Sequence, residues 1–188
     1  MRMTLADFEA RYRREPDPWG YTTSAYEQGK YAATLAACGT GPFSQALELG
    51  ASIGVFSALL APRCASLTTI DASATAVADA RARLSGLDQV HTLLGTIPGD
   101  VPECGFDLVI ASEILYYLSE AELAATLVTL RARMRPRARL VAVHWCPEGP
   151  ERPLGAATVH ATLRAQPWLR AVTRSPTEDY LLDVLEAR

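Results

Sequence analysis

The stretch ALELGASIGVFSALL, residues 46–60, decides the fold. A short apolar run at residues 45–49 leads directly into Gly50, and a helix is predicted from Ile53 to Leu60. A strand that turns through glycine into a helix is typical of an open parallel α/β sheet, and ligands bind at the carboxyl edge of such sheets. The stretch therefore predicts both a fold class and the place of a binding site.

Apolar runs alternate with amphipathic segments beyond this turn. Further strands are predicted at residues 67–70, 90–94, 106–110 and 138–145, with helices at 74–84 and 120–134. A helix at 155–164 and two strand-like runs, 168–174 and 179–187, close the chain. This order predicts a Rossmann-like α/β fold. We expect a seven-stranded, mostly parallel sheet with helices on both faces and a strand pair at its end.

Two helices are predicted before the first strand. One spans residues 4–14, and the second runs to Ala37 from an N-cap at Ser24, with Glu27 completing a capping box. No linker-like or low-complexity stretch interrupts the chain. We therefore expect a single domain over residues 1–188, with an N-terminal helical cap at 1–40 and a Rossmann-like core at 41–188.

The composition is that of a soluble globular protein. Of the 188 residues, 49% are hydrophobic and 21% are charged, and the formal net charge is −3. Neither nucleic acid nor a membrane is therefore predicted as a partner. Arginines cluster between residues 131 and 139, which we interpret as a solvated helix end followed by a turn.

Cysteine spacing and the N-terminus bear on location and metals. The four cysteines lie far apart without histidines at ligand spacing, so neither a metal site nor a disulfide framework is predicted. The first residues lack the apolar core of a signal peptide, and no stretch approaches the length of a membrane span. We expect a cytoplasmic protein, monomeric or homodimeric.

Two acidic residues accompany the glycine turn. Glu48 precedes it, and Asp71 ends the next predicted strand 21 positions after Gly50, where a carboxylate can bind ribose hydroxyls. A nucleoside site is therefore predicted. A nicotinamide-dependent oxidoreductase is an alternative, but it needs G-x-G-x-x-G, and Ser52 stands at the second glycine.

The motifs LELGASIG (47–54) and FDLVIASEILYYL (106–118), together with Asp71, resemble class I S-adenosylmethionine-dependent methyltransferases. Their usual first motif is E-x-G-x-G-x-G, from which Ser52 departs. DPWGYTTSAYEQGKY (17–31), SEILYYL (112–118) and HW (144–145) further resemble the nodulation protein S family, whose members methylate oligosaccharide amines. The resemblance implies transfer of a methyl group from S-adenosylmethionine to an amine of a small molecule, amino sugar or oligosaccharide, leaving S-adenosylhomocysteine.

The same resemblance implies a set of cofactor contacts. Trp19, Ser24 and Tyr26 would close over the methionine end, Gly50 and Ala51 would line it, and Asp71 would hold the ribose. Ala72, Thr96 and Ile97 would flank the adenine, and Ser112, Glu113 and Ile114 would lie beneath the sulfonium. Trp19 is equally consistent with an ordinary core aromatic residue, and Ser24 caps a helix whether or not it contacts a ligand.

Three residues are candidates for acceptor chemistry. An ammonium has no free lone pair, so an amine acceptor needs a base or a site that favours its neutral form. His144 at the end of the fifth strand is the predicted base, Glu113 would orient the amine or share its proton, and Tyr117 would line the acceptor channel. His144 as a structural histidine and a cofactor-binding module without acceptor chemistry remain alternatives. His160, on the helix after the fifth strand, could reach the acceptor cleft, but we interpret it as a surface histidine.

Overall fold

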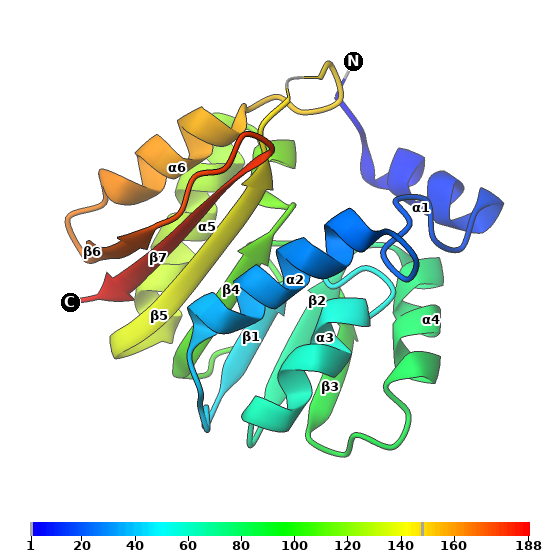
Figure 1. Cartoon of the computed structure of the whole chain (residues 1–188), viewed down its shortest axis with the longest axis horizontal. Coiled ribbons are helices and arrows are strands. Elements are labelled where there is room, and N and C mark those ends of the chain that lie inside the picture. The colour runs from blue at the N-terminus through cyan, green and yellow to red at the C-terminus, as the bar shows by residue number, and fades with distance from the viewer. Residues whose placement is uncertain (1, 148) are drawn as a thin grey trace.

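The computed structural model describes residues 2–147 and 149–188. Its strands form one seven-stranded sheet (Figure 1). Its order is β3-β2-β1-β4-β5-β7-β6. The first five strands pair in parallel, and β7 runs antiparallel to β5 and β6. The strands are β1 (Ala46–Leu49), β2 (Leu67–Asp71), β3 (Val90–Leu94), β4 (Phe106–Ser112), β5 (Met134–Trp145), β6 (Leu169–Arg174) and β7 (Tyr180–Ala187). The predicted fold class is confirmed.

The described residues form six α-helices and two short 3₁₀ turns, of which the first two helices precede β1 and the others lie between strands. The helices are α1 (Leu5–Arg14), α2 (Ala25–Cys38), α3 (Val55–Leu60), α4 (Ala74–Arg83), α5 (Glu120–Arg133) and α6 (Ala156–Arg164). The 3₁₀ turns are η1 (Ala61–Arg63) and η2 (Leu115–Tyr117). Serine side chains cap α2, α4 and α5 because their hydroxyl oxygens accept first-turn N–H groups.

The capping box predicted for α2 forms only in half. Ser24 Oγ accepts the Glu27 N–H at 3.3 Å, as expected. The Glu27 carboxylate, however, accepts a hydrogen bond from Lys30 Nζ at 3.0 Å. The side chain that would complete the box belongs instead to a buried polar cluster on the same helix.

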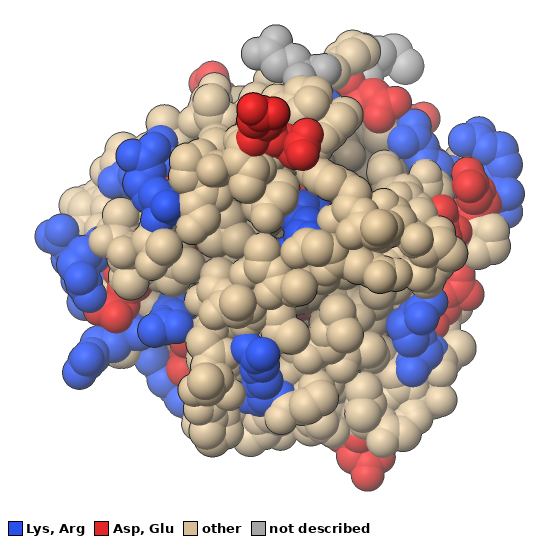
Figure 2. Space-filling view, viewed as in Figure 1, with Lys and Arg blue, Asp and Glu red and all other residues tan. Residues whose placement is uncertain are grey.

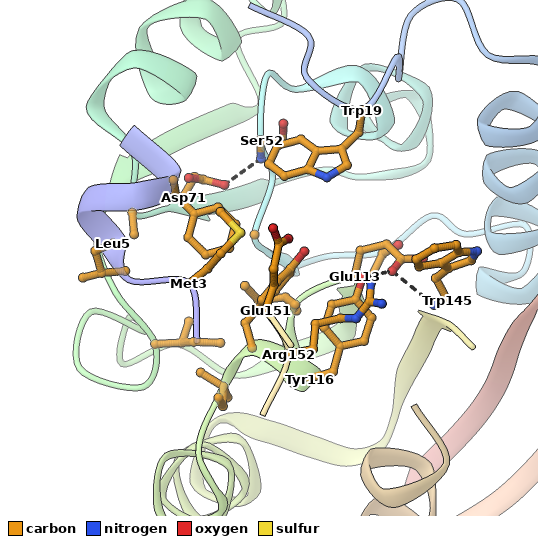
Figure 3. A pocket seen from close by; sticks show the side chains of 18 of the residues that line it. Met3, Leu5, Trp19, Ser52, Asp71, Glu113, Tyr116, Trp145, Glu151 and Arg152 are labelled. Atoms are coloured by element: carbon orange, nitrogen blue, oxygen red, sulfur yellow. Dashed lines mark hydrogen bonds between the residues drawn. The ribbon is translucent and has the colours of Figure 1, made fainter. Parts of the chain in front are cut away.

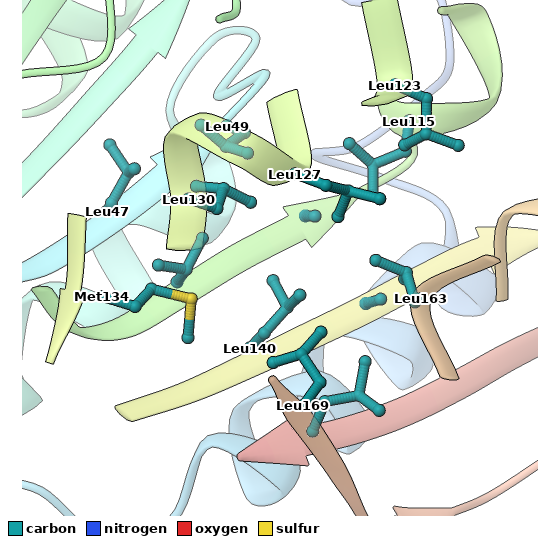
Figure 4. Close-up of a cluster of buried hydrophobic side chains, with 14 of the residues drawn as sticks. Leu47, Leu49, Leu115, Leu123, Leu127, Leu130, Met134, Leu140, Leu163 and Leu169 are labelled. Carbon is teal, nitrogen blue, oxygen red and sulfur yellow. The ribbon is translucent and has the colours of Figure 1, made fainter. Parts of the chain in front are cut away.

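Two hydrophobic layers hold the helices against opposite faces of the sheet. Leu108, Val141 and Val143 pack with Tyr31 of α2 and Phe56 of α3 on one face. The other face packs against α5 and α6, where leucines interdigitate with strand side chains (Figure 4). Both faces of the central strands are therefore dry, as parallel sheets require. Few polar side chains are buried within the strands, and Glu48, Thr69 and Asp183 are among them.

The arginine cluster differs from its predicted structure. Arg131 and Arg133 lie in the last turn of α5, but Arg135, Arg137 and Arg139 belong to β5, which begins at Met134 and not near residue 138. The predicted turn is therefore wrong. The pairing of β5 with β4 shifts register between Phe106 and Leu108, so the extra strand residues are accommodated as an irregularity.

The surface carries charges of both signs. Figure 2 shows separate small groups of basic and acidic side chains among uncharged surface on the face covered by α2 and α3. Within the described part of the chain, no helix is both long and apolar enough to cross a bilayer.

Candidate active site

A cavity of about 1170 Å³ lies over the carboxyl ends of the parallel strands. Asp71 and Ser52 lie near one end of it, and Glu113, Tyr116 and Trp145 lie near the other (Figure 3). The cavity is lined by twelve of the predicted site residues: Trp19, Ser24, Tyr26, Gly50, Asp71, Ala72, Thr96, Ile97, Ser112, Glu113, Ile114 and Tyr117. Two predicted residues, Ala51 and His144, are buried and do not line it.

The glycine turn is shaped by backbone conformation and by one neighbour. Gly50 adopts φ +72°, and a Cβ there would lie 3.1 Å from the side chain of Ile114. Gly54 adopts φ +76°, and a Cβ there would lie 3.2 Å from Ala80 of α4. The space beside Gly50 is thus filled by Ile114, so close approach of a ligand is not the only reason for glycine.

Asp71 is fixed by the turn that it faces. Its Oδ2 accepts the Ser52 N–H at 2.8 Å, and its Oδ1 accepts the Ser73 N–H at 2.9 Å. Burial raises the pKa of Asp71, while these backbone hydrogen bonds oppose the rise. The carboxylate at the β2 tip is therefore held in one orientation at the cavity wall, next to Gly50.

Ser52 does more than replace a glycine. It adopts φ +51°, and its Oγ accepts a hydrogen bond from the Tyr12 hydroxyl of α1. Tyr12 is buried and stacks edge-on against Trp19 at 5.4 Å between ring centroids. The N-terminal cap is thereby joined to the glycine turn by a direct side-chain contact.

Glu48, the acid before the turn, lies inside the sheet and does not line the cavity. It accepts a hydrogen bond from Ser57 Oγ of α3. Burial raises the pKa of Glu48 to about 8, with a further rise from the charge of Asp71. At neutral pH the protonated carboxyl group therefore predominates, and Glu48 serves the packing of α3 on β1.

A second polar group gathers at the other end of the cavity. Glu113 Oε1 accepts a hydrogen bond from Lys30 Nζ at 2.8 Å, and Glu113 Oε2 accepts the Trp145 N–H at 3.1 Å and the Tyr116 hydroxyl. Lys30 also donates to Glu27. We call Glu27, Lys30, Glu113 and Tyr116 the carboxylate cluster. Lys30 is only 3% exposed, so this ammonium lies out of water between two carboxylates.

Backbone strain accompanies the cluster. Glu113 adopts φ +56°, a left-handed conformation that is costly for a residue with a Cβ. Its N–H donates to Val143 O at 2.8 Å, which ties this sharp turn to β5. The strain turns the carboxylate toward Lys30 and the Trp145 N–H, where it closes the cluster.

His144 lies behind the cavity. Its ring has no exposed surface, and its Nε2 accepts the Leu115 N–H at 3.2 Å. Its Nδ1 lies 3.1 Å from His160 Nε2, and His160 Nδ1 lies 3.0 Å from Asp183 Oδ2. We call His144, His160 and Asp183 the histidine chain. Burial lowers the pKa of His144 well below its usual value, so its ring is neutral at physiological pH.

The donor order in the histidine chain follows from its first bond. An N–H group can only donate, so Leu115 leaves Nε2 of His144 as the acceptor and Nδ1 as the protonated nitrogen. That N–H then donates to His160, and the Nδ1–H of His160 donates to Asp183. No ring nitrogen of His144 faces the cavity. His160 is fully buried, so the interpretation of it as a surface histidine is wrong.

The N-terminal segment covers the cavity. The Met3 N–H donates to Glu151 O at 3.2 Å, and Arg11 pairs with the Glu151 carboxylate at 3.0 Å. Phe8 lies edge-on to Tyr117, with 4.9 Å between their ring centroids. Tyr117 therefore lines a wall that is shared by the cap and the η2 turn.

Sequence reasoning missed Glu27 and Lys30 as site residues. Both lie on the buried face of α2 with Thr34 and Cys38, at helical spacing. Two charged residues on an otherwise buried helical face were the available signal, since such groups are seldom buried without partners. Tyr12 and Tyr116 were also missed, because the sequence alone does not show what their hydroxyl groups contact.

No group of metal-ligating side chains is found in residues 2–147 and 149–188. The four cysteines are free thiols, and two of them, Cys38 and Cys64, are buried. The site is therefore built from carboxylates, one lysine, aromatic rings and backbone N–H groups.

Comparison with known proteins identifies relatives. The model of the family described as "Nodulation protein S (NodS)" matches residues 6–143. Nodulation protein S of Sinorhizobium fredii is 32% identical over 127 residues, which cover 66% of this chain and 59% of that protein. Its counterpart from Bradyrhizobium diazoefficiens is 33% identical, with 66% and 61% covered. The chain thus spans about three fifths of the length of these curated relatives.

Solved structures share the fold. The N-methyltransferase NodS from Bradyrhizobium japonicum WM9, in complex with S-adenosylhomocysteine, superposes with a TM-score of 0.87 at 24% identity and covers 98% of this chain and 99% of its own. A structure from Pseudomonas syringae is 33% identical with a TM-score of 0.77, covering 87% and 99%. The nicotinamide-dependent alternative finds no support among these relatives. Because the family model matches most of this chain, residues 6–143 of 188, the chain belongs to the nodulation protein S family.

Proposed function

We propose that this protein is an S-adenosylmethionine-dependent N-methyltransferase that acts on an amine of a small molecule, an amino sugar or an oligosaccharide. The observation that carries the proposal is the two-ended cavity. A carboxylate at the β2 tip lies beside the glycine turn at one end, and a buried carboxylate cluster lies at the other. The first end suits a nucleoside, and the second suits a group that carries or loses a proton.

The residues at the first end fit the cofactor. Asp71 keeps lone pairs for hydroxyl donors, and Ile97 and Ala72 offer apolar surface beside it for a base. Gly50 and Trp19 line the same cavity as Asp71 and Glu113. When bound, S-adenosylmethionine would supply an electrophilic methyl group on a sulfonium. Family membership and the S-adenosylhomocysteine complex of a structural relative support this assignment.

The chain's own contribution is positioning and exclusion of water. In-line displacement depends on alignment of the reacting atoms, so rigid walls matter more than an acid or a base. The cap residues Met3, Phe8 and Trp19 and the ring of Tyr117 close the cavity with apolar surface. Glu113 holds Lys30 and Tyr116 in place, and we infer that it orients the acceptor from there.

The histidine chain supports this arrangement from behind. His144 accepts the Leu115 N–H and so fixes the η2 turn, which carries Tyr116 and Tyr117 to the cavity. We therefore propose His144 as a positioning residue and not as the base that the sequence suggested. The same proposal keeps a single domain over residues 1–188, a cytoplasmic location and a monomeric or homodimeric state.

Asp71 gives the most direct test. We expect wild-type protein to bind S-adenosylhomocysteine in a calorimetric titration, and Asp71→Ala to weaken that affinity about 10- to 100-fold, since charge-assisted hydrogen bonds are lost. Glu103→Gln, a surface change at a side chain that is 85% exposed, is the control and should leave affinity unchanged. Equal affinities of the Asp71→Ala variant and the wild type would remove the ribose role.

A binding module without acceptor chemistry was suggested by Ser52. In the structure Ser52 is accommodated by Tyr12 and Asp71, so its presence gives no reason to doubt the turn. Methylated product from an amine acceptor, detected by mass spectrometry, separates an enzyme from a binding module.

A further inference from the structure

The carboxylate cluster holds more negative than positive charge. Glu27 Oε1 and Glu113 Oε1 lie 3.0 and 2.8 Å from the same Lys30 Nζ. Two carboxylates therefore share one ammonium. The side chains of Glu27 and Glu113 are only 11% and 13% exposed, so water does not compensate the surplus charge fully.

The two carboxylates are not equally satisfied. Both oxygens of Glu113 accept hydrogen bonds, from Lys30, Tyr116 and Trp145. Within residues 2–147 and 149–188, Glu27 Oε2 is buried and has no hydrogen-bond partner. Leaving a buried carboxylate oxygen unpaired is expensive, and native structures usually place such atoms where a further partner binds. The missing hydrogen-bond partner is therefore at Glu27 and not at Glu113.

Nearby charged groups do not fill this role. Arg152 also lies at this end of the cavity, but its guanidinium donates to Pro147 O and stacks over the rings of Tyr116 and Trp145. Asp179, another cavity residue, adds negative charge. Burial raises the pKa of Glu27, and Lys30 opposes the rise only in part. A second cation beside Glu27 would be attracted by Glu27, Glu113 and Asp179.

The position of Glu27 separates it from the nucleoside end. Lys30 ties it to Glu113 after β4, and Glu113 contacts Trp145 at the end of β5. Asp71 ends β2, three strand spacings from β5 in the sheet order. At about 4.8 Å for each spacing, the β2 and β5 tips are about 14 Å apart. A cation at Glu27 would therefore lie away from the ribose that Asp71 is expected to hold, and the affinity for S-adenosylhomocysteine measured below separates the acceptor's ammonium from the cofactor's own.

We propose that Glu27 is the anchor for the methyl acceptor's amine, which it binds as a positively charged ammonium group. The Glu27 carboxylate then takes one proton from that ammonium, which frees the nitrogen lone pair for methyl transfer. The ligand class is a primary or secondary amine, because a neutral hydroxyl compound of the same shape would leave the surplus charge uncompensated. Lys30 holds the carboxylates of Glu27 and Glu113 in place, and the Tyr26 ring, whose centroid lies 5.2 Å from Lys30 Nζ, covers the Lys30 ammonium. This inference rests on the proposed function and names the chemistry of its second substrate.

The experiment compares amines with matched hydroxyl compounds. Wild-type protein saturated with S-adenosylhomocysteine is titrated with D-glucosamine against D-glucose, ethanolamine against ethylene glycol, and benzylamine against benzyl alcohol. We expect at least one amine to bind more tightly than its partner. Glu27→Gln should remove that preference and weaken the amine about 30-fold or more, as for loss of one member of a buried charge pair. Affinity for S-adenosylhomocysteine should be unchanged.

Two controls separate binding from folding. Glu103→Gln removes a surface carboxylate and should retain the amine preference. Glu27→Asp keeps the charge and should retain part of the preference, while thermal melting verifies that each variant is folded. If Glu27→Gln does not fold, the Asp variant carries the test, because its shorter reach should still weaken the amine without affecting its hydroxyl counterpart.

The outcomes are distinct. Equal binding of amines and hydroxyl compounds by the wild type overturns the inference, and so does an amine preference that survives in Glu27→Gln. An equal loss of S-adenosylhomocysteine affinity in Glu27→Gln would assign Glu27 to the cofactor's own ammonium and also overturn it. Failure of wild-type protein to bind S-adenosylhomocysteine or S-adenosylmethionine would instead refute the proposed function.

Discussion

The carboxylate cluster and the histidine chain lie on either side of the same strand ends, yet they are built differently. In the histidine chain each ring nitrogen has a partner, and the line ends at Asp183, which also pairs with Arg164 at 2.6 Å. In the carboxylate cluster, charges are unequal and one oxygen of Glu27 is left over. Closed networks of this kind hold structure, whereas open ones beside a cavity have capacity for a ligand.

Removing the shared cation should produce the largest effect. Lys30→Met leaves Glu27 and Glu113 buried without their ammonium, and we expect a loss of about 3–5 kcal/mol in the free energy of unfolding, measured with denaturant. Arg170→Met is the control, because its pair with Glu186 is exposed and should contribute about 0–1 kcal/mol. A loss below 1 kcal/mol for Lys30→Met would show that the cluster is well hydrated.

The histidine chain should give an intermediate effect on stability and none on proton chemistry. His144→Ala leaves a cavity and an unpaired Leu115 N–H, so we expect a loss of about 2–4 kcal/mol. The shape of the activity–pH profile should not change, because no ring nitrogen faces the cavity. His91→Ala, at an exposed position, should alter stability by less than about 0.5 kcal/mol.

The opposite result would restore the base suggested by the sequence. If His144→Ala keeps the wild-type stability and loses the acidic limb of the profile, the histidine exchanges protons with the acceptor. The lowered pKa of His144 gives a further sign. Below about pH 6.5 the unfolded chain takes up a proton at His144 and the folded ring does not. Wild-type stability should therefore decrease as the pH is lowered through this range, and the decrease should be smaller in His144→Ala.

Glu48 is a further buried carboxyl group, and its hydrogen-bond partner is Ser57 rather than a lysine or an imidazole. With a folded pKa of about 8, it keeps its proton while the unfolded chain ionises from about pH 4.3 upward. Wild-type stability should therefore decrease between pH 5 and pH 8. Glu48→Gln keeps an acceptor for Ser57 and should be more stable than wild type by about 1–3 kcal/mol at pH 7.5, with little difference at pH 5.

Thermal unfolding at several pH values measures this difference. The difference in stability between Glu103→Gln, a surface variant, and wild type should not change with pH. A gap between Glu48→Gln and wild type that stays constant with pH would contradict the assignment of a protonated carboxyl group.

Local signals in the sequence were enough for the order of the elements. The parallel pairing follows from the alternation, and Asp71 and Gly50 meet as predicted because the carboxyl ends of neighbouring parallel strands share an edge. The start of β5 could not be located, because the arginines of residues 135–139 suit a helix end as well as an edge of a sheet. The presence of a strand was therefore easier to predict than the residue at which it begins.

The direction of side chains was harder to predict. Leu140 and Ala142 face α5 and α6, whereas Val141 and Val143 face α2 and α3, so alternation places His144 on the side of α6. Its location at a strand end suggested a base. Its position in the alternation, on the same face as Leu140 and Ala142, would have indicated a histidine packed under α6. Glu27 and Lys30 needed knowledge of how α2 docks on the sheet, which no local pattern contains.

Ser52 has a consequence for how such chains are recognised. A glycine there would relax the positive φ, yet it would remove the oxygen that receives the Tyr12 hydroxyl. The serine accepts backbone strain at positive φ, and in return its side chain hydrogen-bonds the first helix to the ligand-binding loop. A search pattern that insists on glycine at this place would pass over proteins whose caps are secured in this way.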